Sequence, residues 1–319
     1  MSSSAKLIRK SSTLRTVNVI GDYWILLILR DTFLGLHRYS ELKEATPITH
    51  ATLSSRLKRM LAADLLRRDR AGSGRAGQAY RLTAKGRDLY RVMMLLADWE
   101  RRWFTPPGQM RSRNLFTHTV CGRRANPVLI CGHCREPVTF GSVTAEDGPG
   151  AGYEPAAPGR MQRQAAICVD EALNNPRGIT AAAAIIGDRW SAAILAVTFR
   201  RCKRFDEYLD YLKISPHILS VRLAAFIEYG MLERRAYQAS PARYDYVLTP
   251  QAIDLYPVII AMGHWGDRWL DDGSGPPIVT CHRTCGATLD SVLSCSACRG
   301  NVDLAAISSV SQYRVRAAS

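Results

Sequence analysis

The stretch IGDYWILLILR at residues 20–30 returns as IGDRWSAAILA at residues 186–196. A shift of 166 residues aligns the two without a gap from residues 20–103 to residues 186–269, with about a third of the pairs identical. Chance does not produce a match of this length. The chain therefore holds two copies of one domain, called here the first and second repeat.

In the first repeat, most of residues 17–29 are apolar, which predicts a mostly buried helix. Ser40 is the expected N-cap of a short helix that ends near Ala45, before a Thr-Pro breaker. A second helix is predicted over residues 49–63, because Leu53, Leu57, Met60 and Leu61 form one apolar stripe. Two helices joined by a tight turn result.

A two-stranded ribbon is predicted next, because two strand-like runs, ending at Arg70 and starting at Ala79, flank a basic, Gly-rich tip. Thr83 is the expected cap of a final long helix that continues through Trp103. Trp99 and Trp103 are interpreted as core or dimer packing rather than a ligand box. Helix, helix, turn, helix, ribbon and helix is the order of a winged helix-turn-helix.

The motifs IGDYWILLILR, RYSELKEA, LSSRL and YRLTAKGRDL resemble the HxlR-type transcriptional regulators, and IGDRWSAAIL, RFDEYL, LSVRL and YVLTPQAIDL resemble them again. The resemblance implies DNA-binding regulators that usually work as homodimers. This chain carries both copies covalently, so either an intramolecular pseudo-dimer or a homodimer is expected. Many relatives have a redox-sensing Cys just before the first helix; Cys168 lies too far upstream of Gly187 to match it.

The charge balance also indicates a polyanionic partner, with double-stranded DNA as the leading candidate. The 319 residues carry a net charge of +15 and a pI near 9.7. The first repeat holds 16 basic and 9 acidic residues, and the second holds 11 and 9. No apolar run is long enough to span a bilayer, so no membrane partner is expected. A cytoplasmic, nucleoid-associated protein is predicted.

In each repeat, the residues expected to contact DNA lie on the second helix of the helix-turn-helix and on the ribbon. On the helix they lie at its start and on its later turns. They are Thr49, His50, Thr52, Ser55, Arg56, Lys58, Arg59, Arg67, Arg70 and Arg75 in the first repeat, and Ser215, His217, Arg222, Arg235 and Arg243 in the second. For Arg56 and Arg222, an ion pair within the helix-turn-helix is an equal alternative. The ribbon arginines could instead form an ordinary solvated face.

Each repeat is followed by a pattern of soft metal ligands, His-x-x-Cys and then Cys-x-x-Cys. The ligands are His118, Cys121, Cys131 and Cys134 after the first repeat, and His282, Cys285, Cys295 and Cys298 after the second. We expect each set of four to bind one structural Zn²⁺ in a zinc ribbon, with Cys281 as a rival for His282 and free buried thiols as the alternative. His133 is not expected to be a ligand, and the roles of Cys168, Cys202 and Cys281 stay open.

These patterns predict a mainly α-helical chain with small β-sheets (α+β), in which tandem winged helix-turn-helix domains are each followed by a C-terminal zinc ribbon. The expected boundaries are a disordered basic arm at 1–14, the first winged helix at 15–107, the first zinc ribbon at 112–143, a linker at 144–163, the second winged helix at 164–272, the second zinc ribbon at 278–304 and a C-terminal tail at 305–319.

The function expected from the sequence is sequence-specific DNA binding by a transcriptional regulator that is not an enzyme. Four protein ligands leave no open zinc position for water, and the chain has no nucleophile triad, phosphate-cradling Gly loop or deaminase His-x-Glu. Two alternatives stay open. One is a protein-interaction adaptor that uses the zinc ribbons, and the other is a zinc- or redox-responsive regulator.

Overall fold

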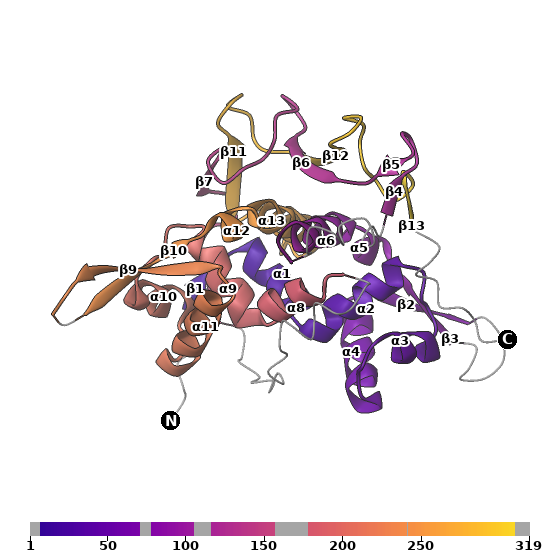
Figure 1. The fold of residues 1–319 in the computed structure, drawn as a ribbon, viewed down its shortest axis with the longest axis horizontal. Helices are drawn as coiled ribbons and strands as arrows, with labels where there is room; N and C mark the ends of the chain where they lie inside the picture. Colours follow the sequence, from indigo (N-terminus) through magenta and orange to yellow (C-terminus); the bar gives the residue numbers. More distant parts are fainter. Residues whose placement is uncertain (1–6, 71–77, 105–115, 157–177, 241, 310–319) are drawn as a thin grey trace. The chain divides into compact units, whose positions relative to one another are not determined.

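The computed structural model describes residues 7–70, 78–104, 116–156, 178–240 and 242–309. The chain forms two compact units (Figure 1). Unit 1 comprises residues 1–21, 130–166 and 188–291, and unit 2 comprises residues 22–129, 167–187 and 292–319. Each unit therefore takes segments from both repeats. The contiguous domain boundaries expected from the sequence differ from this division.

Unit 2 is built around the helix-turn-helix of the first repeat. Its elements are α2 (Tyr23–Phe33), α3 (Tyr39–Ala45), α4 (His50–Ala62), β2 (Leu66–Arg70), β3 (Gln78–Leu82), α5 (Ala84–Arg87), α6 (Tyr90–Phe104), β4 (Phe116–His118), β5 (Arg123–Arg124), α8 (Thr180–Ile186) and β13 (Ile307–Ser309).

Unit 1 is built around the helix-turn-helix of the second repeat. Its elements are β1 (Leu7–Arg9), α1 (Ser12–Ile20), β7 (Val143–Asp147), β8 (Tyr153–Pro155), α9 (Arg189–Thr198), α10 (Phe205–Leu212), α11 (Pro216–Glu228), β9 (Leu232–Gln238), β10 (Arg243–Leu248), α12 (Pro250–Ile253), α13 (Tyr256–Trp269) and β11 (Ile278–His282). The chain passes from one unit to the other within β6 (Pro127–Cys131) and β12 (Ser291–Cys295).

The helix expected over residues 17–29 is in fact two helices, α1 and α2, which belong to different units. The break falls at Gly21 and Asp22. The Asp22 side chain caps α2 by accepting hydrogen bonds from the backbone N–H groups of Trp24 and Ile25, both at 3.1 Å. Asp188 caps α9 by accepting from one backbone N–H group, that of Trp190, at 2.9 Å. The break is easily missed, because apolar residues stand on both sides of it, in the last turn of α1 and throughout α2.

Helix α1 packs against α13 and α9, elements of the second repeat, and Figure 1 shows the indigo α1 beside the orange α13. The contact is close because α13 carries glycine where the helices meet. A Cβ atom at Gly266 would clash with the carbonyl oxygen of Ser12. The Thr16 hydroxyl donates to the carbonyl oxygen of Met262 at 2.8 Å, and Arg15 pairs with Glu154 at 2.8 Å.

Helix α8 makes the reciprocal contact, packing in unit 2 against α2 and α6 of the first repeat. Arg30 and Asp31 form a fully buried ion pair at 2.8 Å. Arg30 also donates to the carbonyl oxygen of Gly178 at 3.0 Å. The Glu100 carboxylate accepts from the backbone N–H of Ala182 at 2.8 Å. Buried charges of the first repeat thus bind the backbone around α8.

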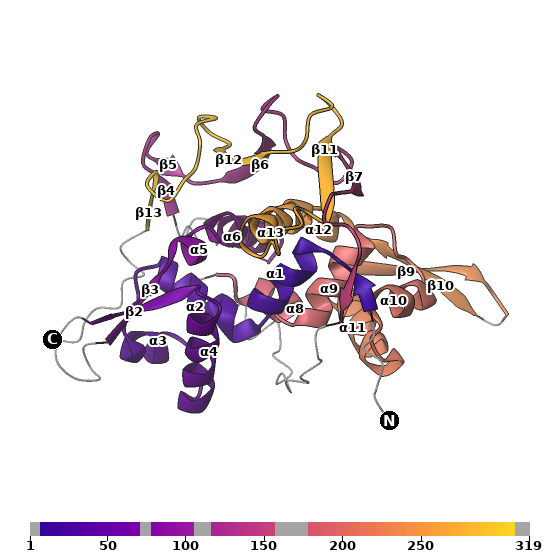
Figure 2. The same ribbon diagram turned by 180° about the vertical axis from the view of Figure 1, so that it is seen from behind.

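Three segments expected to lie outside the folded domains, namely the disordered arm, the linker and the C-terminal tail, contain β-strands. The arm at 1–14 contains β1 and the start of α1, and β1 pairs antiparallel with β8. The linker at 144–163 contains most of β7, which pairs with β11, as Figure 2 shows. The tail at 305–319 contains β13, which pairs with β4. Gly- and Pro-rich composition suggested a linker, but pairing with distant strands satisfies the backbone there.

The other helices and strands of the first winged helix-turn-helix agree with those predicted from the sequence, except at two N-caps. Helix α3 begins at Tyr39, and the Glu41 carboxylate accepts from the backbone N–H of Arg38 at 2.8 Å, so Ser40 is not the N-cap. Thr83 caps the four-residue α5, and the long helix α6 starts afterwards at Tyr90. In the described residues, no helix is long and apolar enough to cross a membrane.

Candidate DNA-binding surface and metal centres

Helix α4 begins directly after Thr49, its N-cap. The Thr49 hydroxyl accepts from the backbone N–H of Thr52 at 3.2 Å and donates to the Thr52 hydroxyl at 2.8 Å. Leu53, Leu57 and Met60 are buried, and they fix this helix against the core of unit 2. Both threonines lie at the start of the helix, as predicted from the sequence. Thr49 is exposed and Thr52 is half-buried.

The exposed face of α4 is a helical stripe in which every residue but Ala51 is polar, made by His50, Ala51, Ser54, Ser55 and Lys58. Successive residues of this stripe are one or three positions apart, which places all five on one side of the helix, away from the buried stripe. Ser54 was missed by the sequence analysis, although it lies one turn after His50. The Tyr39 ring stacks on His50 at 5.9 Å, and the Tyr39 hydroxyl lies 3.2 Å from the Ser54 hydroxyl.

Arg56 makes a structural ion pair, which was the alternative reading of its role. Its Nε lies 2.8 Å from a carboxylate oxygen of Asp22, and its side chain is only 12% exposed. Arg59 also contacts Asp22, at 3.1 Å, but its side chain is 40% exposed. Arg59 can therefore reach solvent, whereas Arg56 holds α4 to the start of α2.

Helix α11 is the counterpart of α4 in the second repeat, and its exposed face is mostly apolar. Ser215 caps it, accepting from the backbone N–H of Ile218 at 3.3 Å, and both Ser215 and His217 are exposed. Val221 is 48% exposed. Arg222 pairs with Asp188 at 3.2 Å, as Arg56 does with Asp22.

The ribbon of unit 2 is formed by β2 and β3, which pair antiparallel with Arg67 opposite Arg81. Asp69 lies 3.6 Å from Arg67 and 2.9 Å from Arg81. Arg67 and Arg68 are exposed, and the sequence analysis did not single out Arg68. The side chain of Arg70, and all of Arg75, lie outside the described residues.

The ribbon of unit 1 is formed by β9 and β10, with a register shift beside Arg243. Arg243 is exposed, and Arg235 lies 3.3 Å from Glu233. Arg234 covers the Tyr244 ring at 4.6 Å. The cations of this ribbon are therefore engaged with a carboxylate and an aromatic ring as well as facing solvent.

The eight predicted metal ligands form two clusters, but with partners exchanged between the repeats. One cluster, within unit 2, joins His118 and Cys121 to Cys295 and Cys298. The other, within unit 1, joins Cys131 and Cys134 to His282 and Cys285. In each cluster the ligand atoms lie within 4.8 Å of one another. The expectation that each site forms within one repeat is wrong.

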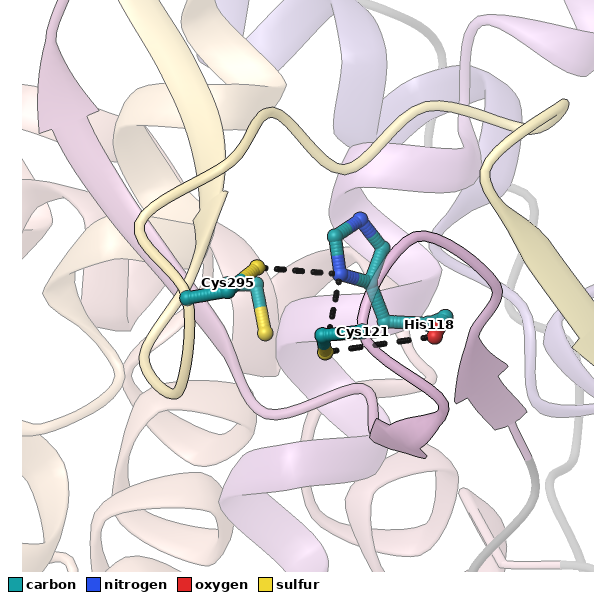
Figure 3. A group of neighbouring side chains, drawn as sticks. His118, Cys121 and Cys295 are labelled. Atoms are coloured by element: carbon teal, nitrogen blue, oxygen red, sulfur yellow. Dashed lines mark hydrogen bonds between the residues drawn. The ribbon is translucent and has the colours of Figure 1, made fainter.

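In the unit 2 cluster, the side chains of His118, Cys121 and Cys295 converge from β4 and the end of β12 (Figure 3). Nδ1 of His118 lies 3.4 Å from the sulfur atoms of both Cys121 and Cys298. Nε2 of His118 lies 3.2 Å from the carbonyl oxygen of Asn301. A carbonyl only accepts, so Nε2 carries the proton and the lone pair of Nδ1 faces the thiols, as metal binding requires.

The unit 1 cluster has the same four ligand types, but Nε2 of His282 is buried and has no hydrogen-bond partner in the described residues. Nδ1 of His282 lies 3.2 Å from the Cys134 sulfur and 3.7 Å from the Cys285 sulfur, and the sulfurs of Cys131 and Cys285 are 3.9 Å apart. A tetrahedral Zn²⁺ with Zn–S bonds of 2.3 Å separates its sulfur ligands by roughly 3.8 Å. Donor set and spacing therefore fit zinc.

The Cys-x-x-Cys turns favour a thiolate at their first cysteine. Burial raises the pKa of Cys131, but the backbone N–H groups of His133 and Cys134 donate to its sulfur, and the net pKa lies below the ordinary thiol value. The pKa of Cys295 is lowered by the matching pair of N–H groups. Thiolate is the form that binds a metal.

The other cysteines of the described residues, and His133, belong to neither cluster. Cys281 lies in β11, opposite Thr144, and is not in a cluster, so His282 is the ligand-forming residue of that pair. His133 is exposed and is also outside the clusters. Cys168 lies outside the described residues, and Cys202 is half-buried.

Comparison with known proteins gives a family match in each repeat. A family model described as HxlR-like helix-turn-helix matches residues 19–107 and 185–274, more than half of the chain. An uncharacterized HTH-type transcriptional regulator of Mycobacterium tuberculosis is 38% identical over 140 residues, which cover 43% of this chain and 85% of that protein. The HTH-type transcriptional regulator YodB of Bacillus subtilis is 29% identical over 90 residues, 28% of this chain and 80% of that protein.

Among solved structures, a protein of Pseudomonas aeruginosa described as a candidate transcription factor is 32% identical. The alignment covers 39% of this chain and 84% of that chain, with a TM-score of 0.31. Since this superposition is poor, the family assignment rests on the two sequence matches.

Proposed function

This chain belongs to the HxlR-like helix-turn-helix family of DNA-binding transcriptional regulators, and we propose that α4 is its principal sequence-reading helix. The observation that carries the proposal is the exposed polar stripe of α4, which ends in Lys58 and lies next to a basic ribbon in unit 2. Helices of this kind enter the major groove with their first turns against the bases.

Within α4, the first turns are proposed to read sequence and the later turns to bind phosphate. His50, Ser54 and Ser55 offer hydrogen-bonding groups of the size that base edges accept. Lys58 and Arg59 lie one to two turns later, and their positive charges suit the phosphate backbone. Arg67 and Arg70, and Arg75 from the segment between β2 and β3 in the sequence, are proposed to add contacts to the DNA backbone that carry little sequence information.

The two clusters are proposed to bind one structural Zn²⁺ each. His118, Cys121, Cys295 and Cys298 would hold the ion of unit 2, and Cys131, Cys134, His282 and Cys285 that of unit 1. Zinc with four protein ligands is structural, and its binding free energy stabilises the fold around it. Each ion would join segments of both repeats and so stabilise the exchanged arrangement.

The second repeat is proposed to act as a partner of the first within one chain, so that one polypeptide supplies two related units. Its own DNA contact is weaker on this account, since Ala224 stands where the first repeat has Lys58. The apolar face of α11, with Val221 and Ile227 exposed, favours a second candidate function for this repeat, docking of another protein as an adaptor.

The test is DNA binding by the full-length, zinc-loaded protein, measured by fluorescence anisotropy on mixed-sequence and genomic duplexes at several salt concentrations. Lys58→Ala should weaken binding to every duplex and reduce the slope of log K against log salt by about 1. His50→Ala should instead change the preference between duplexes, by roughly 1–3 kcal/mol. Lys10→Ala, which removes a lysine outside the helix-turn-helix, is the control and should change neither.

The adaptor reading predicts a different pattern. Binding that is weak and unselective on all duplexes, in protein shown to be folded and metallated, would contradict the assignment of α4. Ala224→Lys separates the roles of the repeats, because it restores a cation to α11. It should steepen the salt dependence only if α11 also lies against DNA.

A further inference from the structure

Unit 1 contains a cavity of about 530 Å³ that plays no part in the proposed DNA or zinc contacts. It lies between α1, α9 and α13 on one side and β7 and β11 on the other. All of its lining residues belong to unit 1. Its volume is in the range of pockets that bind small organic molecules.

One wall of the cavity is aromatic. The rings of Phe140, Phe199 and Tyr256 contact one another with centroids 5.2–5.5 Å apart, in tilted and edge-to-face arrangements. Ile259 and Val143 extend the same apolar lining. Such a wall suits a flat, apolar ring system.

Three lining residues bury a polar atom that has no hydrogen-bond partner in the described part of the chain. These atoms are Nη1 of Arg200, the hydroxyl oxygen of Tyr211 and Oδ1 of Asp267. Folded proteins rarely leave buried polar atoms unsatisfied, so three in one cavity indicate a missing partner.

Arg200 and Tyr211 form one pole, suited to an anion. The guanidinium carbon of Arg200 lies 5.9 Å from the Tyr211 ring centroid. Burial raises the pKa of Tyr211, so its hydroxyl stays protonated and can donate at neutral pH. A cation beside a hydroxyl donor matches a carboxylate, which accepts charge-assisted hydrogen bonds.

Asp267 forms a second pole, suited to a hydrogen-bond donor. It lies on α13, and burial raises the pKa of its carboxyl group more than a hydrogen bond from the Ser12 side chain lowers it. A ligand hydroxyl or amine would donate a hydrogen bond to Oδ1, which has no partner in the described residues.

The first repeat does not carry this set of residues. Arg30 and Asp31, the buried ion pair of unit 2, stand at the positions of Ala196 and Val197, which line the cavity. The positions of the three polar residues carry Leu34, Ala45 and Arg101 instead. The second repeat thus combines small residues on α9 with a distinct polar set.

We propose that this cavity binds a compact aromatic carboxylate that also carries a hydroxyl or amine donor. The carboxylate pairs with Arg200 and Tyr211, the ring lies on the aromatic wall, and the donor binds Asp267. This site is independent of DNA binding, and its test uses no DNA.

The experiment is isothermal titration calorimetry of the full-length, zinc-loaded protein with 6-hydroxy-2-naphthoate. We expect one molecule bound per chain, at least tenfold more tightly than 2-naphthol, which lacks the carboxylate, or 2-naphthoate, which lacks the hydroxyl. Arg200→Gln should reduce affinity for 6-hydroxy-2-naphthoate at least tenfold while leaving affinity for 2-naphthol unchanged. Asp267→Ala, which removes the hydrogen-bond acceptor, should abolish the advantage of 6-hydroxy-2-naphthoate over 2-naphthoate.

Arg204→Gln, which alters an exposed arginine of the same unit, is the matched control and should bind like the parent. Ala145→Trp, a substitution at an exposed lining residue, should block entry without disturbing the core. Circular dichroism and zinc content establish that each variant is folded. Absence of binding at millimolar ligand, or equal affinity of the parent and Arg200→Gln for 6-hydroxy-2-naphthoate, would overturn the proposal.

Discussion

At the scale of single residues, Asp22 shows how one carboxylate organises a helix-turn-helix. It caps α2 through two backbone N–H groups and pairs with Arg56 and Arg59 of α4. Asp188 repeats the arrangement with Arg222. An arginine on the helix that we propose reads DNA can therefore stabilise the fold instead, and the neighbouring side chains decide which role it has.

The first prediction separates these roles. Arg56→Ala should lower the free energy of unfolding by about 1–3 kcal/mol, because it leaves a buried carboxylate with one partner fewer. Lys58→Ala, two residues later and exposed, should leave stability unchanged. Urea denaturation of both variants checks this. Coincident unfolding curves for the parent and Arg56→Ala would show that the pair does not stabilise the protein.

Cys202 gives a prediction in pH. Burial raises the pKa of its thiol to about 11. The thiolate is the reactive form, so at pH 8 Cys202 should be alkylated by iodoacetamide roughly a hundredfold more slowly than glutathione. The rate should rise tenfold per pH unit towards pH 11. Peptide mass spectrometry measures the alkylation rate of Cys202. Fast labelling at pH 8 would contradict the raised pKa and would make Cys202 a candidate thiol sensor.

Local spacing predicted which faces of α4 are buried and which are exposed, but it did not predict the contacts that depend on a residue far along the chain. The start of the helix near Thr49 and the buried stripe from Leu53 to Met60 were predicted from sequence, the stripe by helical periodicity. The choice between DNA contact and ion pair for Arg56 depends on Asp22, which lies 34 residues away. No local pattern contains that information.

At the scale of elements, the boundary at Gly21 and Asp22 decides which unit each helix joins. Hydrophobicity alone did not reveal it, because apolar residues at the end of α1 are followed closely by the largely buried α2. The Gly-Asp pair was visible in both repeats, and it ends one helix and caps the next. The β-strands in the arm, linker and tail were missed because their pairing partners lie far along the sequence.

The close packing of α1 on α13 leads to a third prediction. Gly266→Ala should destabilise unit 1 by about 1–2 kcal/mol, because overpacking against Ser12 outweighs the better helix propensity of alanine. Gly141→Ala, at a position with open space around it, is the control. Urea denaturation followed by tryptophan fluorescence compares them. An increase in stability for Gly266→Ala would contradict the close approach of the two helices.

At the scale of the whole molecule, each unit is assembled from both repeats. The two repeats carry the same ligand motifs at the same spacing, so the sequence is equally consistent with sites formed within a repeat and sites formed between repeats. Only the distances between side chains distinguish the two. In the structure, His118 and Cys121 lie with ligands some 180 residues away, for example Cys298.

Zinc stoichiometry of two double variants tests this exchange most directly. Cys121→Ser with Cys298→Ser damages one cluster, so the protein should retain one Zn²⁺ after dialysis against a moderate chelator. Cys121→Ser with Cys134→Ser damages both clusters, so it should retain none. Elemental analysis and native mass spectrometry give the count. The reverse result, one ion in the second variant and none in the first, would show that each site forms within its own repeat and would contradict the exchanged fold.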